Sequence, residues 1–171
     1  MKTIEIGYYR RNGVELIMGV YDGKLCLLDY LHRAKRSTID NRLQKGLSAK
    51  YKECENALHK EVAKELDEYF KGQRQSFTTP LLLIGSEFQK SVWQTLLTIP
   101  YGTTKSYKAQ AQILGDSKKV RAVANANGAN AIAIIVPCHR VVASDGSLGG
   151  YAGGIETKVK LLDIEQNHVR G

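Results

Sequence analysis

Residues 132–140 read Ile-Ala-Ile-Ile-Val-Pro-Cys-His-Arg. The apolar run before Pro137 predicts a short buried segment in an extended conformation, which the proline ends. Cys138 is thus expected at the end of a core element, beside a possible base in His139 and a fixed positive charge in Arg140. Cationic neighbours lower the pKa of a thiol below its free value of roughly 8.5 and favour the reactive thiolate. The alternative is that Cys138 is a small apolar core residue, as many free cysteines are.

The composition restricts the class of protein. The chain has 171 residues and a formal net charge of +8. No run approaches the roughly 20 apolar residues of a membrane span, and the N-terminus lacks a signal-peptide apolar region, so we expect a cytoplasmic protein. The three cysteines include no C-x-x-C pair, which argues against a disulfide framework and a zinc site. We interpret Cys26, in an apolar run, and Cys54, in an expected helix, as structural.

Positive charge is concentrated in one segment of the C-terminal half. Between residues 105 and 140 the sequence has one acidic residue, Asp116. The same segment has six basic residues: Lys105, Lys108, Lys118, Lys119, Arg121 and Arg140. In the N-terminal half, Lys and Arg alternate with Glu and Asp, as on a solvated helix. The cluster favours an acidic partner such as nucleic acid.

The first 80 residues predict a small α/β domain. Strands are expected at 3–9, 14–21 and 25–31, where β-branched and aromatic residues are separated by Asn12-Gly13 and Asp22-Gly23. The polar, weakly periodic stretch 32–50 predicts an irregular connection. A helix is expected at 53–70, ended by Gly72. Its inward side chains would be Leu58, Val62, Leu66 and Tyr69.

Residues 81–171 predict a second, mainly helical domain, so that the fold class is α+β. Serines suited to cap helices precede three of the four expected helices, and glycines follow the ends of the first two. The expected helices are 86–99 (with Phe88, Val92, Leu96 and Leu97 inward), 107–114, 117–127 and 155–166, capped at Ser86, Ser106 and Ser117 for the first three. Two short helices joined by a tight Gly-containing turn are typical of a helix-turn-helix.

The expected helix at 117–127 has one unusual face. Its inner face would carry Val120, Val123, Ala124 and Asn127. The opposite face would carry Lys118, Arg121, Ala122, Asn125 and Ala126, with Lys119 at the helix start. Small residues around one arginine favour close approach to a nucleic-acid groove, with the lysines on phosphates. The alternative is an ordinary Ala-rich helix favoured by propensity.

A carboxylate falls on the expected inner face of the last helix. Ile155, Val159 and Leu162 form an apolar stripe that continues to Glu165. A buried carboxylate needs a partner, and His139 is available beside the thiol. Cysteine, histidine and glutamate would then be nucleophile, base and orienting acid. Alternatively the helix rotates slightly or frays, leaving Glu165 exposed.

These motifs together resemble the O6-alkylguanine-DNA alkyltransferases. The similarity spans about residues 85–166 and matches in order and spacing. It comprises Ser106-Tyr107, Val120-Arg121-Ala122-Val123, Asn127-Gly128-Ala129-Asn130, Pro137-Cys138-His139-Arg140-Val141, Gly149-Gly150-Tyr151-Ala152-Gly153-Gly154, and Leu161-Leu162 with Glu165. The first 80 residues match in architecture alone, a domain that is ribonuclease H-like in the family.

The resemblance implies direct DNA repair by a single-turnover methylated-DNA–protein-cysteine methyltransferase. The alkyl group of O6-alkylguanine, or of O4-alkylthymine, would move irreversibly to Cys138, without metal or other cofactor. The partner would be double-stranded DNA bound by a monomer through the minor groove, with the damaged base flipped out. By position, His139 matches the residue that takes the thiol proton through a water, and Glu165 the carboxylate that orients it.

Further residues match the family's supporting positions. Arg121 matches the arginine that fills the vacated space, and Tyr107 the tyrosine that assists flipping and hydrogen-bonds the guanine near N3. Asn130 matches the asparagine that braces the active-site turn. Tyr151 matches a wall of the base pocket, and backbone groups near Val141 and Ala152 match contacts to the base edge.

Some positions depart from the family pattern, and two other functions stay open. Ala131 stands where many relatives have proline, Ala133 where some have proline, and Ala152 where some have serine, which leaves tolerance for bulky alkyl groups undecided. A thiol hydrolase built on the same three residues would turn over repeatedly. A binding-only sensor of alkylated bases would not need the cysteine.

Overall fold

A four-stranded sheet organises the N-terminal part of the chain in this computed structural model, which describes residues 2–169. The elements are β1 (Thr3–Arg11), β2 (Val14–Tyr21), β3 (Lys24–Tyr30), α1 (Arg36–Leu47), β4 (Lys50–Glu53) and α2 (Ala57–Phe70). The strand order is β3-β2-β1-β4, with β4 parallel to β1 and the other pairs antiparallel. The chain divides into two compact units, and the boundary between them in the sequence falls between Gly85 and Ser86.

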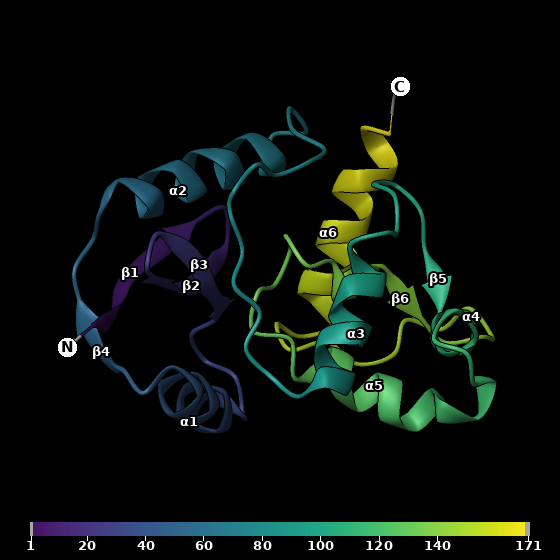
Figure 1. The fold of residues 1–171 in the computed structure, drawn as a ribbon. Coiled ribbons are helices and arrows are strands. Elements are labelled where there is room, and N and C mark those ends of the chain that lie inside the picture. The colour runs from purple at the N-terminus through teal and green to yellow at the C-terminus, as the bar shows by residue number, and fades with distance from the viewer. Residues whose placement is uncertain (1, 170–171) are drawn as a thin grey trace. The chain divides into compact units, whose positions relative to one another are not determined.

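The three predicted strands are confirmed, and their turns explain why they form hairpins. Asn12 and Gly13 both have positive φ, at 57° and 78°, and Asp22 and Gly23 repeat this at 52° and 77°. Two successive positive φ angles define the type I′ turn, whose twist matches that of the strands it joins. After its first residue β3 is buried throughout, so both of its faces are covered. Figure 1 shows α1 and α2 on opposite sides of the sheet.

The expectation of an irregular connection at 32–50 is wrong. This stretch forms α1 and β4, and α1 buries only Ile39 and Leu43. Two buried residues in a polar helix leave little apolar periodicity to detect. Ion pairs supply part of the anchoring instead, because Arg36 contacts both the buried Asp29 and Asp40 at 3.0–3.1 Å.

The helix expected at 53–70 begins later, at Ala57. Residues 50–53 pair with β1 as β4, and Asn56 then caps α2. The Asn56 side chain accepts from the Leu58 backbone N–H, while the His59 ring accepts from the Asn56 N–H. The prediction that Cys54 lies in a helix is therefore wrong. The residue is exposed and lies between β4 and α2. Cys26 is buried in β3, as predicted.

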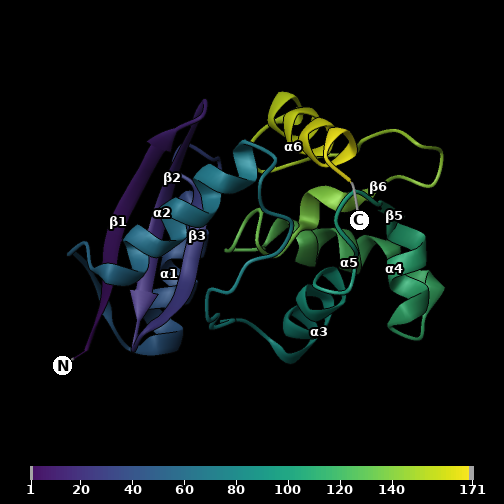
Figure 2. The same cartoon turned by 90° about the horizontal axis from the view of Figure 1, so that it is seen from above.

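The C-terminal unit is mainly helical, as predicted. Its elements are α3 (Glu87–Leu96), β5 (Lys105–Ser106), α4 (Tyr107–Ile113), the 3₁₀ turn η1 (Ser117–Lys119), α5 (Val120–Gly128), the 3₁₀ turn η2 (Cys138–Arg140), β6 (Val141–Val142) and α6 (Ile155–Asn167). Both α3 and α6 pack against η2, and Figure 2 shows them on opposite sides of that segment. Among residues 2–169, no helix is long and apolar enough to cross a membrane.

The helix starts follow the predicted caps in two of three cases. Ser86 and Ser106 accept hydrogen bonds from the backbone N–H groups of Gln89 and Ala109. The third cap is Asp116, not Ser117, and it accepts from the Lys118 N–H at 2.9 Å. The prediction that α3 extends to Ile99 with Leu97 inward is also wrong. Leu97 is 47% exposed.

The run 132–136 is buried, as predicted, but it is not an extended strand. It folds as successive turns, and Ile134 has a φ of 70°. A β-branched residue rarely adopts positive φ, so apolar composition alone could not indicate this path. The regular structure lies just beyond, where β6 pairs in parallel with β5 and sets Val142 opposite Ser106.

A buried amide pair joins α4 to α5. Asn127 Nδ2 donates to Gln110 Oε1 at 2.8 Å, and Gln110 Nε2 donates back to Asn127 Oδ1 at 3.1 Å. Both residues are buried. Since unpaired buried amides are costly, this exchange fixes how the two helices meet.

Gln110→Leu and Asn127→Leu are each expected to lower the free energy of unfolding by about 1–3 kcal/mol, because each removes both hydrogen bonds of the pair and leaves the partner amide buried without them. The double variant removes both amides and is expected to lose clearly less than the sum of the two. Urea unfolding of all four proteins measures the coupling. Additive losses would contradict a mutual hydrogen bond.

Candidate active site

Cys138 is placed by a braced turn. Pro137 precedes it, and it is the first residue of η2 with a partly exposed side chain. Asn130 holds the preceding turns from inside. Its Nδ2 donates to the Val136 carbonyl at 2.8 Å, and its Oδ1 accepts from the Ile132 N–H at 2.9 Å. These bonds hold the segment 130–136 together from within, and they fix where the thiol emerges.

His139 is fully buried, and its two ring nitrogens have different environments. Nε2 lies 2.5 Å from Glu165 Oε2. Nδ1 has no hydrogen-bond partner among residues 2–169. Burial lowers the pKa of His139, and the charges of Arg140 and Lys158 act in the same direction against the pull of Glu165. A neutral ring with its proton on Nε2 leaves a lone pair on Nδ1, which is the form that a general base requires.

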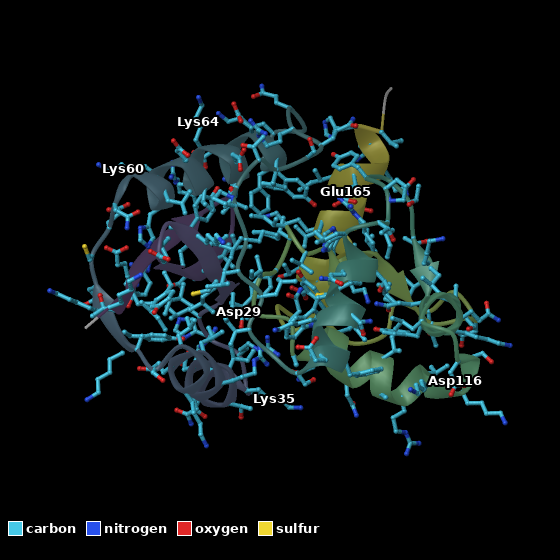
Figure 3. The ribbon with its side chains drawn as sticks, in the orientation of Figure 1. Asp29, Lys35, Lys60, Lys64, Asp116 and Glu165 are labelled. Atoms are coloured by element: carbon cyan, nitrogen blue, oxygen red, sulfur yellow. The ribbon has the colours of Figure 1, made fainter. Side chains whose placement is uncertain are left out.

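Glu165 is buried and paired, as the helical periodicity predicted. Burial alone would raise the pKa of this carboxyl, but the hydrogen bonds from His139 and Arg140 and the positive charge of Arg140 outweigh it and hold the pKa at about 2. Arg140 was expected to act on the thiol. Its guanidinium instead binds Glu165, with Nε to Oε1 at 2.7 Å, and the Ile99 carbonyl at 2.7 Å. Figure 3 shows Glu165 on α6 among the side chains of the helical unit.

The predicted apolar stripe of α6 is wrong, although it led to Glu165. Ile155 is 47% exposed and Val159 is 37% exposed. The buried face carries Lys158, Leu161 and Glu165. A pattern search for apolar residues could not select this face, because two of its three buried members are charged.

Lys158 is a site residue that the sequence did not indicate. Its ammonium group donates to the carbonyls of Val141, Leu148 and Gly150. An ammonium group has three N–H donors, so all of them are used. Lys158 thereby ties the loop after β6 to the residues that follow Cys138.

The residues expected at the base pocket surround this loop. Tyr107 begins α4 and is brought close by the pairing of β5 with β6. Burial raises the pKa of its hydroxyl, and Cys138 adds to this. A Cβ at Gly149 would lie 3.1 Å from Tyr107 Oη, so the loop backbone passes directly against that ring. Tyr151 meets the His139 ring edge-on at 6.4 Å.

Val141 and Ala152, the remaining pocket positions, lie on the two flanks of the same loop. Val141 is buried, and Ala152 is partly exposed. The pairing of Val141 with Lys105 and the bond from Lys158 to its carbonyl fix the first flank. The residues expected at the base pocket therefore come from three chain segments joined by one short sheet and one lysine.

The exposed surface of η1 and α5 carries most of the residues expected to bind DNA. These are Lys118, Lys119, Arg121, Ala122 and Asn125. Ala126 is a correction, since it is 3% exposed and its carbonyl accepts from Trp93 Nε1 at 2.8 Å. Position 126 lies on the side of α5 that packs against α3. Asp116 lies at the turn between α4 and α5 (Figure 3).

No group of three or more His, Cys, Asp or Glu side chains within residues 2–169 is arranged to hold a metal ion.

Comparisons with known proteins identify one family for both units. The DNA-binding domain of 6-O-methylguanine DNA methyltransferase matches residues 87–167, and the ribonuclease-like domain of that protein matches residues 24–83. A methylated-DNA–protein-cysteine methyltransferase from Methanosarcina barkeri is 50% identical over 111 residues, which are 65% of this chain and 70% of that one. Its counterpart from Mycobacterium leprae is 50% identical over 115 residues, 67% and 70% of the two chains.

Solved structures agree with this over nearly the whole chain. The crystal structure of Mycobacterium tuberculosis O6-methylguanine methyltransferase superposes with a TM-score of 0.82 and 33% identity, covering 99% of this chain and 96% of that one. A structure of the Mycobacterium tuberculosis OGT protein in complex with DNA superposes with a TM-score of 0.82 and 34% sequence identity. This match covers 96% of this chain and 94% of that one.

Lys158→Met is expected to lower the free energy of unfolding by roughly 1–3 kcal/mol, because it leaves three carbonyls without their charged donor. It should also raise amide hydrogen exchange in residues 148–150 above that of the rest of the unit. Lys160→Met, a change of the same kind two residues along α6, serves as the control. Unchanged exchange in the loop would contradict the role assigned to Lys158.

Proposed function

The chain belongs to the 6-O-methylguanine DNA methyltransferase family, and we propose that it repairs DNA by moving the alkyl group of O6-alkylguanine onto its own Cys138. One observation carries the assignment of roles. A partly exposed thiol is followed by a buried histidine whose Nε2 is held by Glu165 and whose Nδ1 is unpaired among the described residues. The matched relatives are named methylated-DNA–protein-cysteine methyltransferases, which supports the same chemistry.

The reaction is a displacement at carbon. His139 Nδ1 takes the proton of Cys138 through a water molecule, and the thiolate attacks the alkyl carbon. The carbon–sulfur bond forms as the bond from carbon to O6 of guanine breaks. Tyr107, whose hydroxyl is protonated at neutral pH, gives its proton to N3 as the bond to O6 breaks, so that guanine leaves as a neutral base. The proton that His139 took from Cys138 then returns through water to the Tyr107 oxygen. Glu165 stabilises the imidazolium ion that the proton transfer forms.

The protein is consumed in this reaction. The product is a thioether, and a neutral histidine and a carboxylate provide no route to cleave a carbon–sulfur bond. We therefore propose one alkyl transfer per molecule, without a cofactor. O4-alkylthymine is the second proposed substrate, because its alkyl carbon is also bonded to a ring oxygen substituent that can leave when the thiolate attacks.

The exposed face of η1 and α5 is the proposed DNA-binding surface, with α4 and α5 as a helix-turn-helix in the minor groove. Arg121 enters the duplex and fills the space of the flipped base, and Lys118 and Lys119 contact phosphates. Ala122 and Asn125 keep the helix surface low enough for close approach. We propose that one monomer acts on each lesion in double-stranded DNA.

The flipped base occupies the space beside Cys138. Tyr107 and Tyr151 form its walls, and backbone groups near Val141 and Ala152 contact the base edge. Asn130 acts indirectly, because it holds the turn that carries the thiol.

Incubation with a duplex that contains labelled O6-methylguanine is expected to place one methyl group per protein molecule on the peptide containing Cys138. Cys138→Ser should give none, while keeping affinity for the duplex. Mass spectrometry of the digested protein measures both. Release of product in excess of protein would instead identify a thiol hydrolase, and full repair by Cys138→Ser would remove the cysteine from the reaction.

Arg121→Ala is expected to slow methyl transfer from duplex DNA by about ten- to a hundredfold, because base flipping costs a few kcal/mol and each 1.36 kcal/mol is a factor of ten. Transfer from the free O6-methylguanine base should change little. Lys64→Ala removes one exposed charge from α2 (Figure 3) and is the matched control. Equal losses with duplex and free base would mean that Arg121 supports folding.

A further inference from the structure

Arg140 binds both oxygens of the buried carboxylate that faces His139. Its Nε donates to Glu165 Oε1 at 2.7 Å, and its Nη2 donates to Oε2 at 3.2 Å. The guanidinium is held on its other side by the Ile99 carbonyl at 2.7 Å, and it lies 5.6 Å from the centre of the Tyr101 ring. The whole residue is 7% exposed. Such a planar two-point contact fixes the carboxylate in direction as well as in charge.

The two oxygens of Glu165 therefore serve different partners. Oε2 accepts hydrogen bonds from His139 Nε2, with the two atoms 2.5 Å apart, and from Arg140 Nη2. Oε1 accepts a hydrogen bond from Arg140 Nε and a longer one, at 3.4 Å, from the Gly102 backbone N–H. The negative charge is balanced by arginine, whereas the histidine supplies one hydrogen bond.

A lone carboxylate against a buried imidazole would stabilise the protonated ring, so that the ring would carry a proton at rest and could not accept the one from Cys138. The charges that act on His139 are Glu165 and Lys158 from α6 and Arg140 from η2 itself. Its other neighbours that titrate are Cys138 in η2 and Tyr151 in the following loop. Two of the three charges oppose protonation, and Arg140 is the one in contact with Glu165.

We propose that Arg140 is a positioning residue of the proton relay: by holding both oxygens of Glu165, it lets this carboxylate orient His139 while the imidazole stays neutral and ready to accept the Cys138 proton. This rests on the proposed function, because it concerns the step in which His139 acts as the base. Arg140 touches neither substrate nor sulfur in this role. It acts through Glu165.

The pH dependence of the reaction follows from this arrangement. A folded histidine whose pKa is lowered binds its proton only at acid pH, so the base stays active until the pH falls below roughly the free value of 6.5. Without Arg140, the unbalanced Glu165 would favour the imidazolium form. The loss of activity on the acid side would then move to higher pH.

The experiment compares the wild-type chain with Arg140→Gln and Arg140→Lys. Single-turnover methyl transfer to Cys138 is followed from about pH 5 to about pH 9, and the His139 ring is titrated by NMR in the Cys138→Ser background. For Arg140→Gln we expect both midpoints to rise by about one pH unit, so that the rate at the acid end falls by about tenfold more than at the alkaline end. Arg140→Lys, which keeps the charge but loses the two-point contact, should shift less than Arg140→Gln.

A rate that falls by the same factor at every pH, with an unmoved His139 midpoint, would overturn the proposal and leave Arg140 a purely structural residue. If Arg140→Gln does not fold, the wild-type titration decides, because a His139 midpoint at or above about 6.5 contradicts a neutral resting base. Failure of the wild type to methylate Cys138 would instead refute the proposed function. The histidine titration still tests Arg140 in that case.

Discussion

A carboxylate in the protein interior is the interaction on which the C-terminal unit depends. Glu165 projects from α6 into a region where a lone charge would be costly, and it is satisfied by His139 and Arg140 from η2. Arg140 in turn binds the carbonyl of Ile99, just beyond α3. One buried carboxylate thus connects α6, the turn that carries the thiol, and the end of α3. Removing a single partner from such a group typically costs several kcal/mol, since the remaining charge stays buried.

Lys158 performs a parallel task about two turns earlier on α6. Glu165 fixes the segment at Cys138, and Lys158 fixes the loop that follows β6 through three backbone carbonyls. The helix therefore uses its buried face for charge and leaves Ile155 and Val159 partly exposed. Side chains of one helix therefore hold both the turn that contains His139 and Arg140 and the loop that follows β6.

The sequence predicted those features that depend on local chemistry. The hairpins followed from Asn12-Gly13 and Asp22-Gly23, which suit positive φ, and two helix starts followed from Ser86 and Ser106. The pairing of Glu165 with His139 followed from helical spacing and from the rule that buried charge needs a partner. What failed depended on tertiary packing. The helix α1 buries too few apolar residues to show a period, Ile134 adopts a φ that its side chain disfavours, Ala126 faces Trp93, and a buried Lys158 contradicts the usual preference of lysine for solvent.

Buried ion pairs seldom add net stability, because desolvation offsets their attraction. An apolar core around α6 could therefore hold the same helices together, and stability does not explain why Glu165 and Arg140 are present. The geometry suggests what they provide instead. In the proposed reaction, the histidine is neutral at rest, is fixed in one tautomer and carries a proton only during the transfer. Such a histidine needs a hydrogen-bond acceptor at Nε2 whose charge is already balanced. Arg140 supplies that balance from the residue next to the base, so the thiol, the base and the balancing cation are three consecutive residues of one turn.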